Sequence, residues 1–550
     1  MTEISTPSTT DRDSQFDVVV IGAGFAGLYA LHRLRGLGLS VRVLEAAGGI
    51  GGTWHWNAYP GARCDVESYQ YSYSFSAELD QEWTWSERYA GQPEILAYIE
   101  HVADRFDLRR DIQLNTRVDA ATFDEARSTW SVATEAGERF EATYVIFATG
   151  SLSAPLAPPF PGVHRFSGES YMTQTWPHEP IDFAGKRVAV IGTGSSGVQL
   201  IPVVAERAGH LTVFQRTPNF SAAGRNRRLH PDELAAIKDN YPAHRDQQRA
   251  SNGGVVLDIN RRPAAEMTPA AQRTELEKRW AAGGMLPLTV AFADVLTDPD
   301  TNKIVQEFLR DKIVDRVSDP TIAELLSTTN HPFAGKRPCV DHGYFETFNR
   351  DNVTLVSIRD NPIAEITGTG VRMSDGTHHE FDMICYANGY DAITGALHRI
   401  DIRGRGSLSL REQWAAGPRT YLGLGFAGFP NLFSVAGPGS PAVLAMMIGL
   451  AEHNVDWITE CIDSMRARAV TTIEPRPQSQ GRWTDHVAQT ADAVYAYRTA
   501  EGSYYKGANV PGKPHTFAIY VGGMRRYRRA CDYETTNGYP GFILGAKPHH

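Results

Sequence analysis

Two runs of apolar residues end directly in glycine-rich turns and frame the whole chain. Residues 16–21 (FDVVVI) are rich in apolar and β-branched side chains, as in a buried parallel strand. The turn GAGFAG follows, residues 28–37 have a helical apolar period, and a strand at 40–44 ends at Glu45. An acid about 20 residues beyond such a turn is typical of a dinucleotide-binding unit, where it accepts hydrogen bonds from ribose. The glycines let a pyrophosphate approach the backbone, and the candidate residues are Gly22, Gly24, Ala26, Gly27 and Glu45.

The second apolar run, residues 188–191, opens another unit of the same kind. It ends in the turn GTGSSG, a helix follows, and the next strand at 211–214 runs into Arg216 without a terminal acid. An arginine there can pair with a 2′-phosphate, so this unit is predicted to prefer NADP to NAD; a plain surface arginine is the alternative. The candidate residues are Gly192, Gly194, Ser195, Ser196, Gly197, Arg216 and Thr217, with Lys336 as a further phosphate partner.

The stretch after the first unit, residues 51–65, reads GGTWHWNAYPGARCD. Flat aromatic side chains beside flexible backbone suit a wall against a planar ring. Arg63 and Asp65 add opposite charges, and a loop with a structural ion pair is the alternative. Residues 69–75 alternate aromatic and small polar residues, as a half-buried strand would. A helix is predicted over 93–106, hairpins over 116–142, and a buried strand over 144–147 that runs into ATG.

The remaining pattern predicts an α/β protein with two Rossmann-like dinucleotide-binding domains and a helical insertion. Prolines mark a linker at 155–161, residues 221–319 are polar and helical, and a strand at 381–385 runs into ANG, which echoes the earlier ATG. That echo predicts a return into the first domain. We expect a disordered leader at 1–15, a first domain at 16–154 and 381–550, a second at 155–220 and 331–380, and the insertion at 221–330.

Length and composition narrow the class of function. A chain of 550 residues is too long for one core, and a net charge of −9 without a basic block argues against nucleic acid and anionic membranes. The five scattered cysteines form no CxxC, which excludes a dithiol reductase, gives no indication of a cysteine zinc site or a disulfide framework, and favours a cytoplasmic protein. Residues 421–452 are almost uncharged, but glycines and prolines leave only a helix at 441–451, too short for a membrane span.

Several longer motifs are more specific than either glycine turn. They are GGTWHWNAYPGARCD at 51–65, FSGESYMTQTWP at 166–177, FNRDNV at 348–353, WAAGPRTYLG at 414–423 and GANVPGKP at 507–514. In this order the chain resembles the type I Baeyer–Villiger monooxygenases, and is similar to their phenylacetone and steroid monooxygenase subgroup. The resemblance extends over residues 17–542.

The resemblance implies a reaction and two cofactors. FAD would occupy the first unit and NADPH the second; the reduced flavin and O2 would give a C4a-peroxyflavin that attacks a ketone, and migration would yield an ester or lactone. Arg337 would stabilise the negative charge of the peroxide and of the adduct, with Asp65 as its carboxylate partner. Beyond the turns, the implied FAD residues are Gly52, Thr53, Trp54, Asp65, Tyr71, Val118 and Met447, and the implied NADP residues include Arg63, Lys336 and Tyr504.

The chain departs from the family pattern at three positions. Met172 stands where the family signature has histidine, in a linker that supports domain movement. Asn388 replaces threonine, and Tyr504 replaces tryptophan. We expect these changes to alter coupling or gating while leaving the reaction class. The linker residues of interest are Phe166, Gly168, Met172, Trp176 and Pro177.

Three alternatives remain open. The first is a flavin monooxygenase of sulfur or nitrogen, which would need a protonated hydroperoxide. The second is a poorly coupled NADPH oxidase, and the third is an FAD-bound sensing or interaction protein without turnover. In the leading hypothesis the partners are a small-molecule ketone and O2, with no metal, and residues 439–447 and 280–286 line the substrate cavity.

Overall fold

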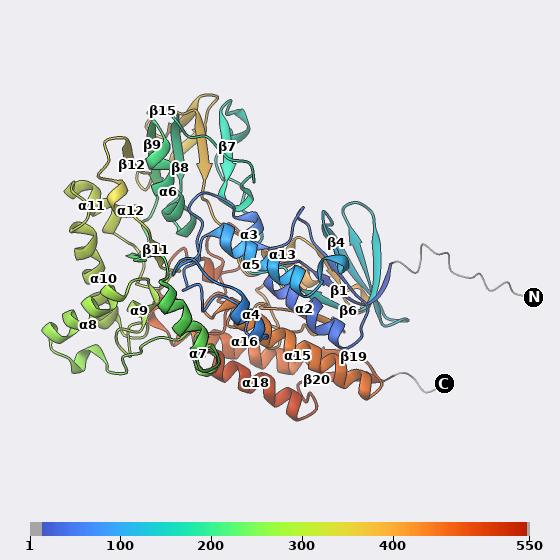
Figure 1. Cartoon of the computed structure of the whole chain (residues 1–550). Coiled ribbons are helices and arrows are strands. Elements are labelled where there is room, and N and C mark those ends of the chain that lie inside the picture. The colour runs from blue at the N-terminus through green and yellow to red at the C-terminus, as the bar shows by residue number, and fades with distance from the viewer. Residues whose placement is uncertain (1–13, 547–550) are drawn as a thin grey trace, which may run out of the picture.

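The computed structural model describes residues 14–546 and contains two main β-sheets, the first mixed and the second parallel, and in each sheet one parallel strand runs into a glycine turn (Figure 1). The predicted α/β class is confirmed. The expected disordered leader falls on residues 1–13, which lie outside the described residues, and on Ser14 and Gln15; Gln15 already belongs to the first strand. Within residues 14–546, no helix combines the length and apolar character that a membrane crossing needs.

The first sheet has eight strands. Its order is β17-β4-β5-β6-β1-β2-β3, and β18 pairs with β6. The apolar strand β1 lies between β2 and β6, parallel to both, as its burial on both faces requires. Helix α2 (Phe25–Gly36) covers this centre together with the long helix α15 (Met447–Ala467). The strands are β1 (Gln15–Ile21), β2 (Val41–Leu44), β3 (Ile112–Gln113), β4 (Val118–Asp124), β5 (Thr129–Thr134), β6 (Arg139–Phe147), β17 (Asp401–Arg403) and β18 (Leu432–Ser434).

The second sheet has five strands, all parallel, in the order β12-β9-β8-β16-β7. Helix α6 (Ser195–Arg207) follows its glycine turn, and a small antiparallel sheet, β13-β14-β15, lies beside it. The strands are β7 (Glu169–Met172), β8 (Arg187–Ile191), β9 (His210–Gln215), β12 (Val353–Ser357), β13 (Ile363–Ile366), β14 (Gly370–Met373), β15 (His378–Glu380) and β16 (Met383–Tyr386).

The assignment of residues 381–385 to the first domain is wrong. Strand β16 lies inside the second sheet, between β8 and β7, because its four fully buried residues suit a position with a neighbour on each side. The chain rejoins the first sheet only at β17. The resemblance between ATG and ANG therefore marks equivalent positions in two sheets, one for each glycine turn.

The insertion is helical, as predicted, but it divides between the two halves of the molecule. Helices α8, α9 and α10 pack with β10 (Ser221–Ala223) and β11 (Cys339–Asp341), whereas α7 lies against α4 (Ala77–Glu82) of the first half (Figure 1). Thr268 caps α8 by accepting a hydrogen bond from the Ala271 N–H at 3.3 Å. The helices are α7 (Pro231–Ala250), α8 (Pro269–Ala282), α9 (Leu286–Thr289), α10 (Pro299–Val314) and α11 (Pro320–Ser327).

The remaining elements surround these two halves. Helix α5 (Gln92–Arg105) and the antiparallel ladder β4-β5-β6 confirm the helix and hairpins expected over 93–106 and 116–142. The C-terminal part adds the antiparallel pair β19-β20. The other bounds are α3 (Thr53–Trp56), α12 (Tyr344–Thr347), α13 (Gly395–His398), α14 (Leu410–Gln413), α16 (Pro477–Asp492), α17 (Tyr495–Arg498), α18 (Met524–Thr536), β19 (Val470–Pro475) and β20 (Phe542–Ala546).

Two predicted elements are corrected. Residues 69–75 form turns and not a strand, because side chains from distant helices take their polar groups: Arg245 donates to the Tyr73 carbonyl at 2.9 Å, and Glu452 accepts from the Ser74 N–H at 2.6 Å. The helix expected at 441–451 begins only at Met447. Val443, at φ 56°, lies in the left-handed region and breaks any helix before that point.

The carboxyl group of Glu452 carries a pH-dependent part of the stability. Burial raises its pKa from 4.5 to about 7, against hydrogen bonds from Ser74 that lower it. The folded protein therefore keeps a proton that the unfolded chain releases as pH rises from 4.5 to 7. The free energy of unfolding should fall through this window by on the order of 3 kcal/mol and stay lower above it.

Glu452→Gln should remove that loss. Urea unfolding at pH 5 and pH 8 is expected to give a smaller difference between the two pH values for the variant than for the wild type. An equal difference in both proteins would show that Glu452 does not hold the proton.

Candidate active site

The first glycine turn forms a tight cradle at the start of α2. Gly22 has φ 106°, and a Cβ there would lie 2.7 Å from the Ala148 carbonyl oxygen. A Cβ on Gly27 would lie 1.8 Å from the Gly22 oxygen. Glu45 is buried, and its carboxylate accepts from the backbone N–H groups of Ala23 at 2.6 Å and Ala47 at 2.8 Å. This close, N–H-rich backbone at a helix start fits a pyrophosphate.

The second glycine turn repeats this geometry at the start of α6. Gly192 has φ 112°, and a Cβ there would lie 2.5 Å from the Ala387 carbonyl oxygen. A Cβ on Gly197 would lie 2.1 Å from the Gly192 oxygen. Ser195 and Ser196 open the helix behind the turn. The protein therefore holds two cradles of the same chemistry, one for each of the two main sheets.

One cavity of about 2150 Å³ joins the two cradles. Residues of both halves and of the segment at 251–259 line it. Gly27 and Gly197 lie behind the turns and are not among the lining residues. The predicted cofactor residues that line it are Gly22, Gly24, Ala26, Glu45, Gly52, Thr53, Trp54, Arg63, Asp65, Tyr71, Val118, Gly192, Gly194, Ser195, Ser196, Arg216, Thr217, Lys336, Met447 and Tyr504.

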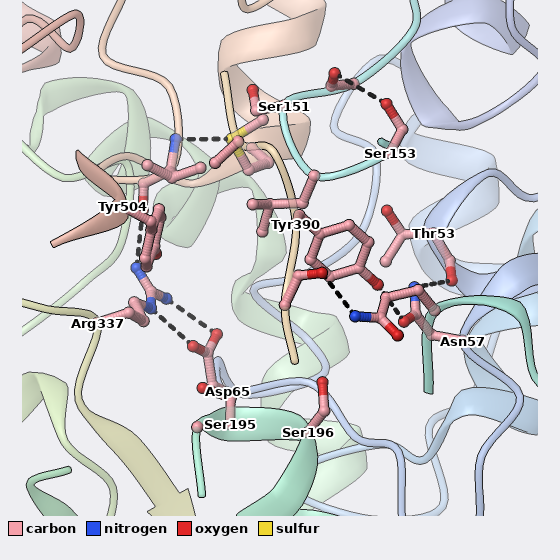
Figure 2. Close-up of a pocket in the computed structure, with 18 of the residues that line it drawn as sticks. Thr53, Asn57, Asp65, Ser151, Ser153, Ser195, Ser196, Arg337, Tyr390 and Tyr504 are labelled. Carbon is pink, nitrogen blue, oxygen red and sulfur yellow. Dashed lines mark hydrogen bonds and ion pairs between the residues drawn. The ribbon is translucent and has the colours of Figure 1, made fainter. Parts of the chain in front are cut away.

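Arg337 and Asp65 meet in this cavity, although 272 positions separate them in the sequence (Figure 2). Nε and Nη2 of Arg337 donate to the two carboxylate oxygens of Asp65 at 2.8 and 2.9 Å, and Nη1 donates to the Val443 carbonyl at 2.8 Å. Desolvation lowers the pKa of Arg337, but the charge and hydrogen bonds of Asp65 outweigh it and raise the pKa above its ordinary value. The guanidinium is therefore a fixed cation, held by two different loops.

A second positive site lies by the nucleotide turn of the second sheet. Burial lowers the pKa of Lys336, and the neighbouring charge of Arg216 lowers it further. Both side chains line the cavity, and within residues 14–546 neither has a carboxylate partner. Because Lys336 and Arg216 lie close together without a carboxylate partner among the described residues, they form a site that favours a dianion such as a phosphate.

The linker FSGESYMTQTWP, residues 166–177, lies largely behind the cavity. Trp176 is buried against Tyr171, with ring centres 5.3 Å apart, and Phe166 packs on the second sheet with Met172. Gly168 is needed for close approach, because a Cβ there would lie 2.4 Å from the Asp382 carbonyl oxygen. None of Phe166, Gly168, Met172, Trp176 and Pro177 lines the cavity.

The linker touches the cavity through Gln174 and Thr175, which the sequence did not single out. The Gln174 amide donates to the Gly389 carbonyl at 2.6 Å, so the linker is tied to the ANG segment behind the second glycine turn. Asn388, which lines the cavity, donates to the Leu156 carbonyl at 2.6 Å. Met172 and Asn388 therefore belong to the junction between linker and sheet.

Gln199 is a further residue that sequence reasoning missed. Its side chain accepts from the Tyr59 hydroxyl at 2.7 Å and donates to the Arg63 carbonyl at 2.9 Å, so α6 of the second half holds a loop of the first half. It lies one helical turn after Ser195, and that spacing could have placed it on the same face. Arg63 itself pairs with Glu87 rather than with Asp65.

Two more polar contacts complete the wall. The Tyr390 hydroxyl donates to the Asn57 side-chain oxygen at 2.5 Å, and the Asn219 amide donates to the Arg337 carbonyl at 2.8 Å (Figure 2 shows Tyr390 and Asn57). Within residues 14–546, no group of three or more His, Cys, Asp or Glu side chains could hold a metal ion. The cavity thus brings two glycine-turn cradles together with the fixed guanidinium of Arg337.

Comparisons with known proteins agree with this geometry. The family described as pyridine nucleotide-disulphide oxidoreductase matches residues 19–276. Acetone monooxygenase (methyl acetate-forming) of Gordonia sp. is 42% identical, over 96% of this chain and 99% of the relative. A Baeyer-Villiger monooxygenase of Pseudooceanicola batsensis is 39% identical, over 98% of both chains. Phenazine N-monooxygenase of Lysobacter antibioticus is 38% identical, over 98% of this chain and 99% of the relative.

A solved structure gives the same result at the level of the fold. Oxidized steroid monooxygenase bound to NADP superposes with a TM-score of 0.92 and 48% identity, covering 96% of this chain and 99% of that one. These similarities cover nearly the full length of the chain. Their sequence identities, 39–48% for the Baeyer–Villiger and steroid enzymes, are high enough to establish a family relationship. The chain therefore belongs to the Baeyer–Villiger monooxygenase family.

Proposed function

We propose that this protein is an NADPH- and O2-dependent FAD monooxygenase that inserts an oxygen atom beside a ketone carbonyl to give an ester or lactone. The observation that carries the proposal is the fixed guanidinium of Arg337, held by Asp65 in the cavity that joins two dinucleotide cradles. The family relationship and the ketone named for the acetone monooxygenase relative support it.

We assign FAD to the first cradle and NADPH to the second. Bound in these cradles, the two cofactors would supply hydride transfer from NADPH to FAD and the activation of O2. Gly22 to Gly27 and Glu45 would bind the first nucleotide, with the wall at Gly52 to Trp54 beside the planar ring; Gly192 to Gly197 would bind the second. The first domain then comprises residues 16–154 with the chain after β16, and the second comprises β7 to β16 with α8 to α11.

Arg337 supplies the electrostatic part of the reaction. Three of the five N–H donors of a guanidinium bind Asp65 and Val443, which leaves two for the reacting atoms. These donors can stabilise the negative charge that develops on the carbonyl oxygen when the ketone is attacked. Asp65 orients the planar group and neutralises its charge at rest, so the cation needs no reorganisation during the step.

A substrate panel tests the reaction class. The FAD-loaded enzyme is given NADPH, O2 and ketones of different size, and ester formation, NADPH consumption and hydrogen peroxide release are measured together. Ester from at least one ketone is expected, with peroxide release reporting the coupling that Met172 and Asn388 affect. Peroxide alone would leave an NADPH oxidase, and no flavin bleaching by NADPH would leave a binding protein.

Oxygenation at nitrogen or sulfur is the second candidate. The similarity to a phenazine N-monooxygenase favours it specifically, since that relative matches over almost the full length. The fixed cation at Arg337 favours the ketone reaction, because it stabilises an anionic oxygen. Paired ketone, sulfide and tertiary-amine or phenazine substrates in the same panel separate the two, and product from the heteroatom substrates alone would replace the first proposal.

Arg216 should set the preference for NADPH over NADH. In Arg216→Ala, the KM for NADPH is expected to rise about tenfold or more, since a hydrogen bond to a charged group contributes about 1.5–3 kcal/mol. The KM for NADH should change little. Steady-state kinetics with both nucleotides measure this, with Arg350→Ala at an exposed site as the matched control. Equal changes for both nucleotides would show that Arg216 does not recognise the 2′-phosphate.

We also propose a cytoplasmic location. The five cysteines, Cys64, Cys339, Cys385, Cys461 and Cys531, are all buried and unpaired, as suits a reducing compartment. The acidic net charge supports partners that are small molecules and not nucleic acid.

A further inference from the structure

Two histidines from different parts of the chain face each other outside the cavity. His55 lies on α3, in the loop that walls the cavity, and His178 follows Trp176 and Pro177 at the end of the linker. Their Nε2 atoms are 3.3 Å apart, and the ring planes are tilted by 48° with centres 4.5 Å apart. The proposed reaction uses neither ring, and neither residue lines the cavity.

The two nitrogens are close enough for a direct hydrogen bond, and their separation also fits two ligands of one metal ion. Hydrogen bonds donated by nitrogen peak at about 2.9–3.0 Å between heavy atoms. Two imidazole nitrogens bound to one zinc ion at about 2.0–2.1 Å, at the tetrahedral angle, are about 3.3 Å from each other. The observed separation therefore matches one edge of a tetrahedral site.

The surroundings hold His55 in place and leave His178 open to solvent. A Cβ on Gly49 would lie 2.7–2.8 Å from the His55 ring, so this glycine allows the ring to lie against the backbone. Trp56 contacts the His55 ring edge-on at 5.7 Å. His178 is exposed, so water can fill the remaining coordination positions.

We propose that His55 and His178 form a two-histidine site for a divalent transition-metal ion of the zinc class, which joins the cavity wall of the first half to the linker of the second. The ion would be a bridge between the two nucleotide-binding halves and not a participant in the chemistry. With only two protein ligands, the ion would need water molecules to complete a tetrahedral coordination.

Zinc binding to the FAD-loaded enzyme tests the site directly. Isothermal titration with Zn²⁺ should give one saturable site in the wild type, and His178→Ala and His178→Gln should each weaken it about tenfold or more, since a single imidazole remains. His164→Ala, at another exposed histidine, is the matched control and should bind as the wild type does. A variant with His549 and His550 replaced removes the adjacent pair at the end of the sequence and should also keep the site.

Two further measurements keep the proposal independent of activity. Electron paramagnetic resonance of one equivalent of Cu²⁺ should report two nitrogen ligands in the wild type and fewer in His178→Ala. Zn²⁺ should also raise the thermal unfolding midpoint of the wild type more than that of His178→Ala, by mass action. Equal zinc affinity in wild type and both His178 variants, or loss only in the His549 and His550 variant, would overturn the proposal.

Discussion

Arg337→Ala is expected to lower the rate of ester formation by at least about 10²–10³-fold, the loss typical when one group that stabilises a developing negative oxygen is removed. Reduction of the bound flavin by NADPH should remain close to the wild-type rate. The reason is geometric: Arg337 keeps two N–H groups that Asp65 and Val443 do not occupy, whereas the glycine turns proposed to bind the cofactors are separate structures.

Two further variants sharpen this experiment. Arg337→Lys keeps the charge but cannot bind both oxygens of Asp65 in parallel, so ester formation should stay well below that of the wild type. Asp65→Asn keeps the size of the partner and should reduce the rate by leaving the arginine less firmly oriented. Stopped-flow reduction without oxygen and product analysis with oxygen separate the two half-reactions. Normal ester formation by Arg337→Ala would remove Arg337 from the mechanism.

The second large effect concerns stability. Asp80→Ala should lower the free energy of unfolding by about 3–5 kcal/mol, because it leaves Arg245 as a buried charge without its partner. Only 4% of the Arg245 side chain and 8% of the Asp80 side chain are exposed. Arg245 also donates to Ser72 at 2.7 Å and Tyr73 at 2.9 Å, so the same group holds α7, α4 and the turns at 69–75 together.

Urea unfolding measures this effect, with two comparisons. Asp124→Ala breaks an ion pair with Arg127 at the surface and should leave the unfolding midpoint close to that of the wild type. Replacing both buried partners, as in Asp80→Leu with Arg245→Met, should cost much less than Asp80→Ala alone, because no buried charge is left unpaired. If Asp80→Ala alone were as stable as the wild type, solvent would have to reach the Arg245 guanidinium.

Local chemistry made much of the fold predictable. Each glycine turn has a positive φ at its first glycine and a close backbone approach at its last. Both requirements fall within six adjacent residues, so the sequence pattern alone identifies the turn. The helices and hairpins of the first half followed from periodicity in the same way. Strand β16 was misassigned because four apolar residues fit either sheet, and only their neighbours decide between them.

The contacts of the candidate site were harder to predict from the local sequence pattern than the fold was. Arg337 and Asp65 were paired by family resemblance, and no spacing rule joins residues that lie 272 positions apart. Gln199 was missed because a glutamine on a helix is usually solvated, and its importance comes from a loop of the other half. The turns at 69–75 were mistaken for a strand because their polar partners, Arg245 and Glu452, come from helices far along the chain.

The division of the helical insertion has a consequence for engineering. Helix α7 is fixed to the first half by Arg245, whereas α8 to α10 pack with strands β10 and β11, and the segment that connects them at 251–259 lines the cavity. Libraries that randomise residues 251–259 to broaden the substrate range would therefore also change the connection between the two halves of the protein. Variants from such libraries should be ranked by product formed per nucleotide consumed, since turnover alone would not distinguish a better fit from a looser connection.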